Sequence, residues 1–153
     1  MSDMSKEPPY VEENARQLER MRALVERLGD EDLRSPVYGR WTVAGVLGHI
    51  AFWDARNLVL GEKLERGEPF SPSDDEPEDV DWINDSVSPF IHAMQPREAA
   101  ILSLRLAEET DARMASLPQD RMYPVEPASP INPLRATHRG EHLDDIEAAL
   151  AGS

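Results

Sequence analysis

Hydrophobic residues recur at three- and four-residue steps along four stretches of the chain, with charged residues between them. This period places apolar side chains on one face of an α-helix, because about 3.6 residues make one turn. The pattern predicts helices over residues 9–28, 42–67, 82–117 and 132–150. No stretch shows a strong β-strand pattern. The sequence therefore predicts an all-α fold, and four such helices with one or two long connections indicate a four-helix bundle.

The ends of the first two predicted helices carry capping residues. Gly29 stands where a C-terminal cap of the first helix belongs. Thr42 is a good N-cap for the second helix, and Trp41 before it can pack on Val46 as a hydrophobic staple. Residues 30–40 are therefore expected to be a connector.

Two proline-rich stretches predict long loops after the second and third helices. The first, residues 67–81, is acidic and has no periodicity; it is either a solvated crossover or a lid over a site. The second covers residues 118–133. Pro96 is expected to break the third helical region. Asn132 is expected to cap the fourth helix, with Pro133 at its first position.

Composition narrows the class of protein. The 153 residues suffice for one substantial core, so residues 1–153 are expected to form a single domain. The formal net charge of −14 repels phosphate backbones and anionic headgroups, so neither nucleic acid nor a membrane is an expected partner. No apolar run resembles a membrane span or a secretory signal, so a cytoplasmic location is expected. The chain has no cysteine, which excludes disulfides and thiolate metal ligands.

The placement of the four histidines suggests chemistry. His138 and His142 are four residues apart on the last predicted helix, so the two rings lie on one face, one turn apart, and can offer two nitrogens to one metal ion. His49 lies beside the apolar stripe of the second helix, where a buried core histidine is the simpler interpretation. His92 has no feature of a ligand and is expected to be a surface or packing residue.

Two glycines, Gly45 and Gly48, lie near His49 inside a predicted helix. Glycine costs roughly 1 kcal/mol relative to alanine at such positions, so it needs a compensating reason. Close approach of a neighbouring helix and room for a cavity beside His49 are both adequate reasons, and the sequence does not decide between them.

Two other metal-site classes fit poorly. His138-Arg139-Gly140-Glu141-His142 matches the pattern of inverted zinc peptidases, but only eleven residues follow His142, too few to supply the downstream glutamate ligand of those larger enzymes. Di-iron bundles need a glutamate three residues before a histidine, and none of the four histidines has one.

Two segments resemble the DinB-like superfamily of four-helix bundles, which includes mycothiol-dependent maleylpyruvate isomerases and bacillithiol transferases. The first runs from Trp41-Thr42 to His49-Ile50-Ala51-Phe52-Trp53-Asp54, and the second from His138 through His142 to Ile146. The separation of 89 residues between His49 and His138 and the length of the chain also fit this family.

The resemblance implies a divalent metal, zinc or nickel, bound by His49, His138 and His142. Three imidazoles with open positions are typical of a working metal site, since a structural zinc has four protein ligands. The implied reaction is metal-assisted attack of a low-molecular-weight thiol, or of water, on a small-molecule substrate in a transfer, isomerisation or hydrolysis. Glu141 and Asp54 are candidate catalytic carboxylates that orient a ligand or act as general base, although each could be a plain helix carboxylate.

A non-catalytic bundle is the alternative, for instance a homodimer that keeps the metal for structure or binds a ligand without turnover. The chain lacks the extra C-terminal domain of the isomerases, and no basic cluster is evident for the carboxylates of a thiol cofactor. Four arginines are available for that purpose: Arg56, Arg97, Arg135 and Arg139.

Overall fold

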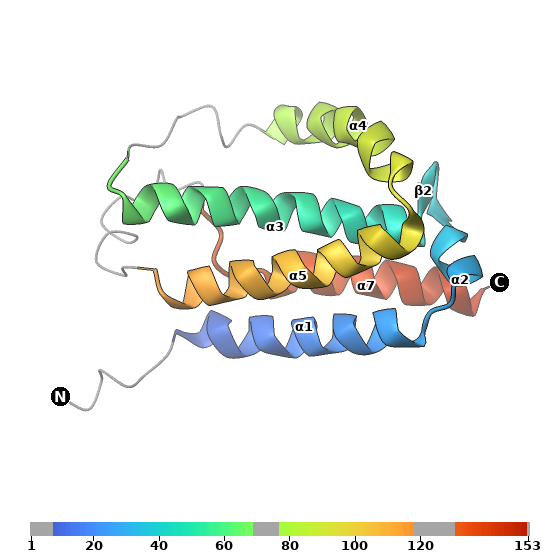
Figure 1. The fold of residues 1–153 in the computed structure, drawn as a ribbon, viewed down its shortest axis with the longest axis horizontal. Coiled ribbons are helices and arrows are strands. Elements are labelled where there is room, and N and C mark those ends of the chain that lie inside the picture. The colour runs from blue at the N-terminus through green and yellow to red at the C-terminus, as the bar shows by residue number, and fades with distance from the viewer. Residues whose placement is uncertain (1–7, 69–76, 118–130, 153) are drawn as a thin grey trace.

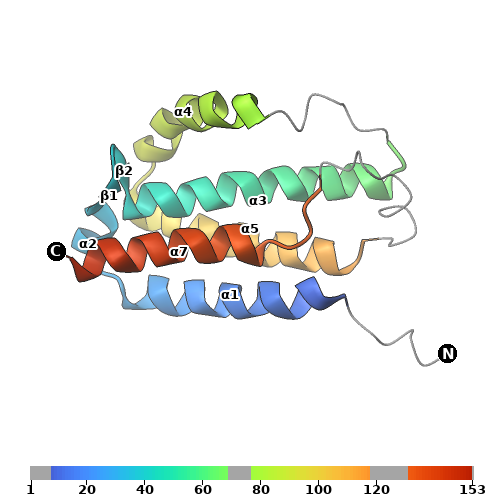
Figure 2. The same cartoon turned by 180° about the vertical axis from the view of Figure 1, so that it is seen from behind.

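The computed structural model describes residues 8–68, 77–117 and 131–152. Four long helices lie side by side: α1 (Pro9–Arg27), α3 (Val43–Glu65), α5 (Pro96–Ala115) and α7 (Ala136–Ala151). Each of the four packs on two of the others, in the cyclic order α1, α5, α3, α7 (Figures 1 and 2). This arrangement confirms the predicted all-α four-helix bundle.

The helix α4 (Pro77–Ala93) lies outside the bundle, against α3 (Figure 1). It carries the chain back along α3, so α3 and α5 run in the same direction (Figure 1). The predicted break at Pro96 is confirmed, but α4 begins at Pro77 rather than Trp82. The last five residues of the predicted loop 67–81 are thus helical. Residues 69–76, where the lid interpretation falls, and the loop residues 118–130 lie outside the described part of the chain.

The first helix ends as expected, although the capping residue differs. Leu28 is the C-cap of α1, and Gly29 is instead the N-cap of a short helix, α2 (Asp30–Arg34). The predicted connector therefore contains a turn of helix. Leu33 of α2 is fully buried in the core, which explains why this segment folds onto the bundle.

A small hairpin follows α2, where the sequence indicated no strand. Strand β1 (Pro36–Tyr38) pairs antiparallel with β2 (Trp41–Thr42). The turn between them has Gly39 at a φ of 51°, a left-handed conformation that glycine adopts without steric cost. Such short strands have no detectable period-2 pattern, which is why the sequence analysis missed them.

The predicted start of α3 is confirmed. The Thr42 hydroxyl accepts a hydrogen bond from the backbone N–H of Gly45 at 2.9 Å, so it caps the helix. Gly45 and Gly48 both face α4. A Cβ added at Gly45 would lie 2.3 Å from Nε2 of His92, and one added at Gly48 would lie 2.5 Å from a methyl carbon of Ile91. Close approach of a neighbouring helix is therefore the reason for these glycines.

The start of α7 differs from the prediction. The helix begins at Ala136, after Asn132 and Pro133. The side chain that binds its first N–H groups comes from α1: Oδ1 of Asn14 accepts from the backbone of Arg135 at 2.7 Å and of Ala136 at 2.8 Å. Since this cap is distant in sequence, no local pattern could reveal it.

Replacing Asn14 by alanine is expected to lower the free energy of unfolding by about 2 kcal/mol. The change leaves two buried backbone N–H groups without an acceptor, and each such loss costs about 1 kcal/mol or more. Urea denaturation of the metal-free protein measures the effect. Glu13→Ala is the matched control, because Glu13 is the exposed neighbour on the same helix. An Asn14→Ala midpoint equal to that of Glu13→Ala would contradict the capping role.

Candidate metal centre

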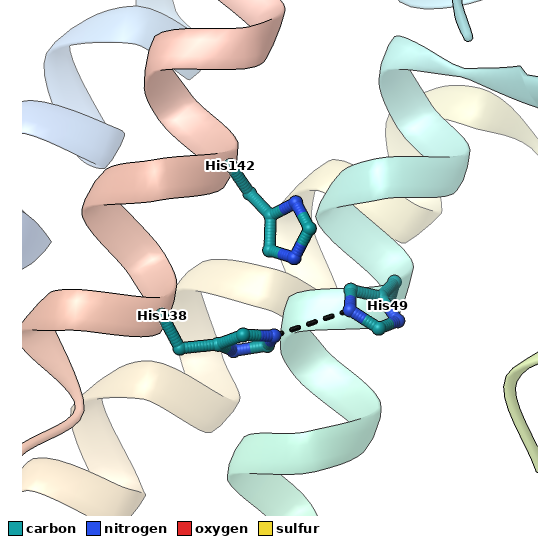
Figure 3. A group of neighbouring side chains, drawn as sticks. All are labelled: His49, His138 and His142. Atoms are coloured by element: carbon teal, nitrogen blue, oxygen red, sulfur yellow. Dashed lines mark hydrogen bonds between the residues drawn. The ribbon is translucent and has the colours of Figure 1, made fainter. Parts of the chain in front are cut away.

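Three histidine rings from two helices meet between α3 and α7. His49 comes from the second turn of α3 and is 8% exposed, while His138 and His142 come from successive turns of α7. The Nε2 atoms of His49 and His138 are 3.1 Å apart, and all three ring centroids lie within 4.7–5.0 Å of one another (Figure 3). The structure therefore brings together the three histidines that the sequence analysis selected.

The environment keeps these rings neutral. Burial, and then the nearby His142, lower the pKa of His49 to about 4. Burial is also the largest cause for His138, whose pKa falls to about 2 with further contributions from the two other histidines and from Arg135 and Arg139. Burial lowers the pKa of His142 as well, against the opposing effect of Asp145 and Glu141. Near pH 7 each ring can thus offer a lone pair rather than a positive charge.

The donor set fits a divalent metal ion. Each ring offers one nitrogen, and these three atoms all lie within 4.8 Å of one another. Two nitrogens about 2.0–2.1 Å from a tetrahedral zinc ion would be roughly 3.3 Å apart, close to the 3.1 Å between His49 and His138. Without a cation, one proton must lie between these two Nε2 atoms, because two facing lone pairs repel. Imidazole is a favoured ligand of zinc and nickel.

The second nitrogens of the rings differ in their surroundings. Nδ1 of His142 lies 3.2 Å from the hydroxyl of Tyr38 and 3.6 Å from a carboxylate oxygen of Asp145. Nδ1 of His49 and Nδ1 of His138 are buried, and no protein atom among the described residues hydrogen-bonds to either. Tyr38 therefore holds the ring of His142, and Nε2 of that ring turns toward the other two rings (Figure 3).

The hairpin supplies two aromatic side chains that the sequence analysis did not assign to the site. Tyr38 stands at the end of β1, and Trp41 begins β2. The Trp41 ring packs edge-on against His49 and His92, with centroid distances of 5.7 and 5.3 Å. Trp41 thus contacts a candidate ligand, a role beyond the predicted staple. Pro36 and Gly39 were the available sequence signal for a tight turn before Trp41.

A cavity of about 810 Å³ opens beside the three histidines. Tyr38, Trp41 and Trp53 give it an aromatic wall, and polar side chains of α3, of α4 and of the segment before α7 complete it. Those polar side chains are Arg56, Asn57, Asp81, Asn84, Asp85, Asn132 and Arg135. Nε1 of Trp53 donates to Oδ1 of Asn84 at 2.7 Å, which fastens α4 over the cavity. The volume suits a small organic molecule.

The two candidate carboxylates lie in very different places. Glu141 is exposed on α7. Asp54 is 1% exposed and accepts hydrogen bonds from Nε of Arg135 at 2.9 Å and from Nη2 of Arg139 at 3.2 Å. A catalytic role for either residue stays a prediction.

Of the four arginines considered for a cofactor, two line the cavity. Arg56 lies there with its guanidinium 5.5 Å from the centre of the Trp53 ring, and Arg135 lies there while paired with Asp54. Arg139 is fully buried between Asp54 and Asp111. Arg97 binds the backbone carbonyls of Val25 and Leu28, at the end of α1.

The fourth histidine is a packing residue, as the sequence indicated. Nδ1 of His92 lies 2.9 Å from the carbonyl of Ser88, one turn earlier on α4. Its Nε2 accepts a long hydrogen bond from the backbone N–H of Thr42, 3.4 Å away. The ring rests on Gly45 and Trp41, and it is not among the residues that converge on the candidate site.

The fold and the site define a four-helix bundle with a three-histidine centre. Residues 13–143 match the sequence profile of the DinB superfamily. The chain belongs to this superfamily, because the match covers most of its length. No curated protein and no solved structure shows a significant match to the chain. Within the described residues, no helix is long and apolar enough to cross a membrane.

Proposed function

We propose that this protein is a metal-dependent enzyme acting on a small molecule. One observation carries the proposal: three neutral imidazoles converge at the wall of an open cavity of about 810 Å³. His49, His138 and His142 would hold the ion, and zinc and nickel are the proposed metals. A bound divalent cation would lower the pKa of a water or of a low-molecular-weight thiol, so that either becomes a nucleophile near neutral pH.

The surrounding residues support a catalytic role over a structural one. A structural zinc site closes its coordination with four protein ligands, whereas this cluster offers three, and its open side faces the cavity. The hydroxyl oxygen of Tyr38 would accept a hydrogen bond from the Nδ1–H group of His142 and hold that ring in orientation. The aromatic wall would bind the apolar part of a substrate, and Arg56 would attract an anionic group.

The proposal extends to features that the sequence alone suggested. Transfer of a thiol to an electrophile is the proposed reaction; the same site would serve isomerisation with the thiol, or hydrolysis with water as the nucleophile. We further propose a single domain, a cytoplasmic location and a homodimer. Asp54 and Glu141 remain proposed supporting carboxylates. The alternative is a bundle that keeps its metal without turnover.

Turnover by metal-loaded protein tests the proposal. Protein purified without a histidine tag is analysed for its metal content and then loaded with zinc or nickel. We expect it to accelerate conjugation of a small thiol to monochlorobimane, followed by fluorescence, and the metal-free protein to lose this activity. A loaded protein that is inert with a panel of thiols, electrophiles and hydrolysable esters would favour the non-catalytic alternative.

A further inference from the structure

Four charged side chains, three of them buried, lie next to the three histidines and bind one another. The side chain of Asp54 on α3 is 1% exposed, that of Arg135 at the N-cap of α7 is 5% exposed and that of Arg139 within α7 is 0% exposed. The side chain of Asp111 on α5 is 15% exposed. Asp54 binds both arginines, and Arg139 reaches Asp111 with two hydrogen bonds, at 2.9 and 3.0 Å. The two positive and two negative charges balance. We call this set the charge network.

The charge network connects the helices that carry the histidines, at the level of the histidines. Asp54 follows His49 by five residues on α3, and Arg139 directly follows His138 on α7. Each oxygen of Asp54 binds a different arginine, and these arginines are four residues apart, one turn of α7. A shift of α7 along its axis would therefore break at least one of the two bonds.

The same bonds also fix the rotation of α7. Arg135 and Arg139 form one i, i+4 pair, and His138 and His142 form a second, about 60° around the helix from the first. When the arginine pair faces Asp54, the histidine pair is turned toward His49 and the cavity. A third contact fixes α7 against α1, because Nη1 of Arg139 donates to the backbone carbonyl of Asn14 at 3.1 Å.

Stability alone is a weak reason for such a network. Apolar side chains of similar volume often stabilise a buried site as well as paired charges do, whereas charged pairs specify one register. The large apolar cluster of α1, α3, α5 and α7 already includes Leu143 and Ile146 of α7. An apolar contact between helices tolerates small rotations of either helix, whereas the geometry of metal ligands does not.

We propose that Asp54, acting through Arg135 and Arg139, is the positioning residue of the three-histidine site. It sets the register and the rotation of α7, so that His138 and His142 meet His49. This inference rests on the proposed function for its purpose, but its geometric content applies to the metal-free protein too. Asp111 supports it by holding the far side of Arg139.

Two measurements on the Asp54→Asn variant test the proposal. In metal-free protein, nuclear Overhauser effects between the ring protons of His49 and His138, whose centroids are 5.0 Å apart, report their contact. In a titration with Co²⁺ alone, the visible absorption bands report affinity and coordination. We expect Asp54→Asn to weaken the ring contact, to lower Co²⁺ affinity about 10- to 100-fold and to change the band intensities.

A destabilised control variant, changed away from the histidines, separates positioning from general destabilisation. Met114→Ala removes a fully buried side chain from a second apolar cluster, which contains none of the histidines. Its buried members are Tyr10, Leu60, Leu64, Met114, Leu117 and Ile131. At temperatures where circular dichroism shows both variants folded, we expect Met114→Ala to keep Co²⁺ affinity within about twofold and the bands unchanged. Equal losses in both variants, or wild-type behaviour of Asp54→Asn, would overturn the proposal.

An apolar replacement of the charge network gives a second, independent test. The variant Asp54→Leu, Asp111→Leu, Arg135→Met, Arg139→Met is expected to unfold at a denaturant concentration near that of the wild type but to bind Co²⁺ at least about 10-fold more weakly. Should Asp54→Asn fail to fold, Asp111→Asn, which keeps Asp54 in place, is expected to show a smaller loss of the same kind. Co²⁺ spectra equal to those of the wild type in both the fourfold variant and Asp111→Asn would overturn the proposal. If the wild type binds no Co²⁺, the proposed function fails, while the ring contact still tests the positioning role.

Discussion

Replacing His49 by alanine is expected to lower the affinity for Zn²⁺ or Co²⁺ roughly 100- to 1000-fold. A four-ligand zinc site gains about 10–16 kcal/mol on binding, so one imidazole contributes about 3–4 kcal/mol, which corresponds to two or three powers of ten. The residual site would consist of His138 and His142 on one helix. Competition with a chromophoric chelator measures the affinity, and the protein must lack a histidine tag, which would bind the same ions.

His92→Gln is the matched control for this prediction. It removes the only other histidine, which rests on Gly45 and Trp41 and lies outside the three-histidine cluster. We expect its metal affinity to equal that of the wild type within about twofold. Equal losses in the two variants would show that any disturbance near α3 weakens binding. An unchanged affinity in His49→Ala would remove His49 from the site.

The bundle and the histidine cluster could be predicted because both depend on regular helical spacing. An i, i+4 pair on α7 fixes two rings on one face, and the stripe around Leu47 and Ile50 places His49 at the inward edge of α3. The resemblance to a known family supplied the pairing between these helices. Spacing alone could not, because residues 49 and 138 belong to helices whose packing is a tertiary property.

The polar contacts between helices were the part that could not be predicted. Asn14 occupies an inward position of α1, while its apolar neighbour Ala15 is exposed. Arg139 likewise lies on the buried stripe of α7, between Ala136 and Leu143, and Asp54 follows Ile50 on that of α3. A polar residue at a core position of its helix was the available signal. The sequence offers no means of deciding which partner balances it.

The ends of elements were predicted well where the cap is local and poorly where it is not. Thr42 caps α3 through its own next turn, so its role follows from the sequence. The N-terminus of α7 is capped by Asn14 of α1, so Asn132 was assigned that role wrongly. The hairpin that carries Tyr38 depends on only a few residues and on packing against α7. The residue that holds His142 was therefore missed.

Acidification is expected to destabilise the metal-free protein by about 4 kcal/mol between pH 7 and pH 5. In the unfolded chain a histidine has a pKa of about 6.5, whereas folding lowers the pKa of His49 to about 4 and that of His138 to about 2. Below pH 6.5 the unfolded chain therefore binds protons that the folded protein does not. Stability falls as the pH falls, by about 2 kcal/mol for each ring at pH 5.

The pH range over which stability changes identifies the histidines that cause the change. The contribution of His49 should level off near pH 4, where its folded ring also takes up a proton, and that of His138 continues toward pH 2. Urea denaturation at pH 5, 6 and 7 in the presence of a chelator measures the slope, above the range in which most carboxylates titrate. The double variant His49→Leu, His138→Leu should lose most of the dependence of stability on pH, because leucine binds no proton. Equal urea midpoints for the wild type at pH 5 and pH 7 would mean that burial does not hold the two rings neutral. The same rings would then be poor candidates for metal ligands in mildly acidic solution, because a protonated imidazole cannot bind a metal ion.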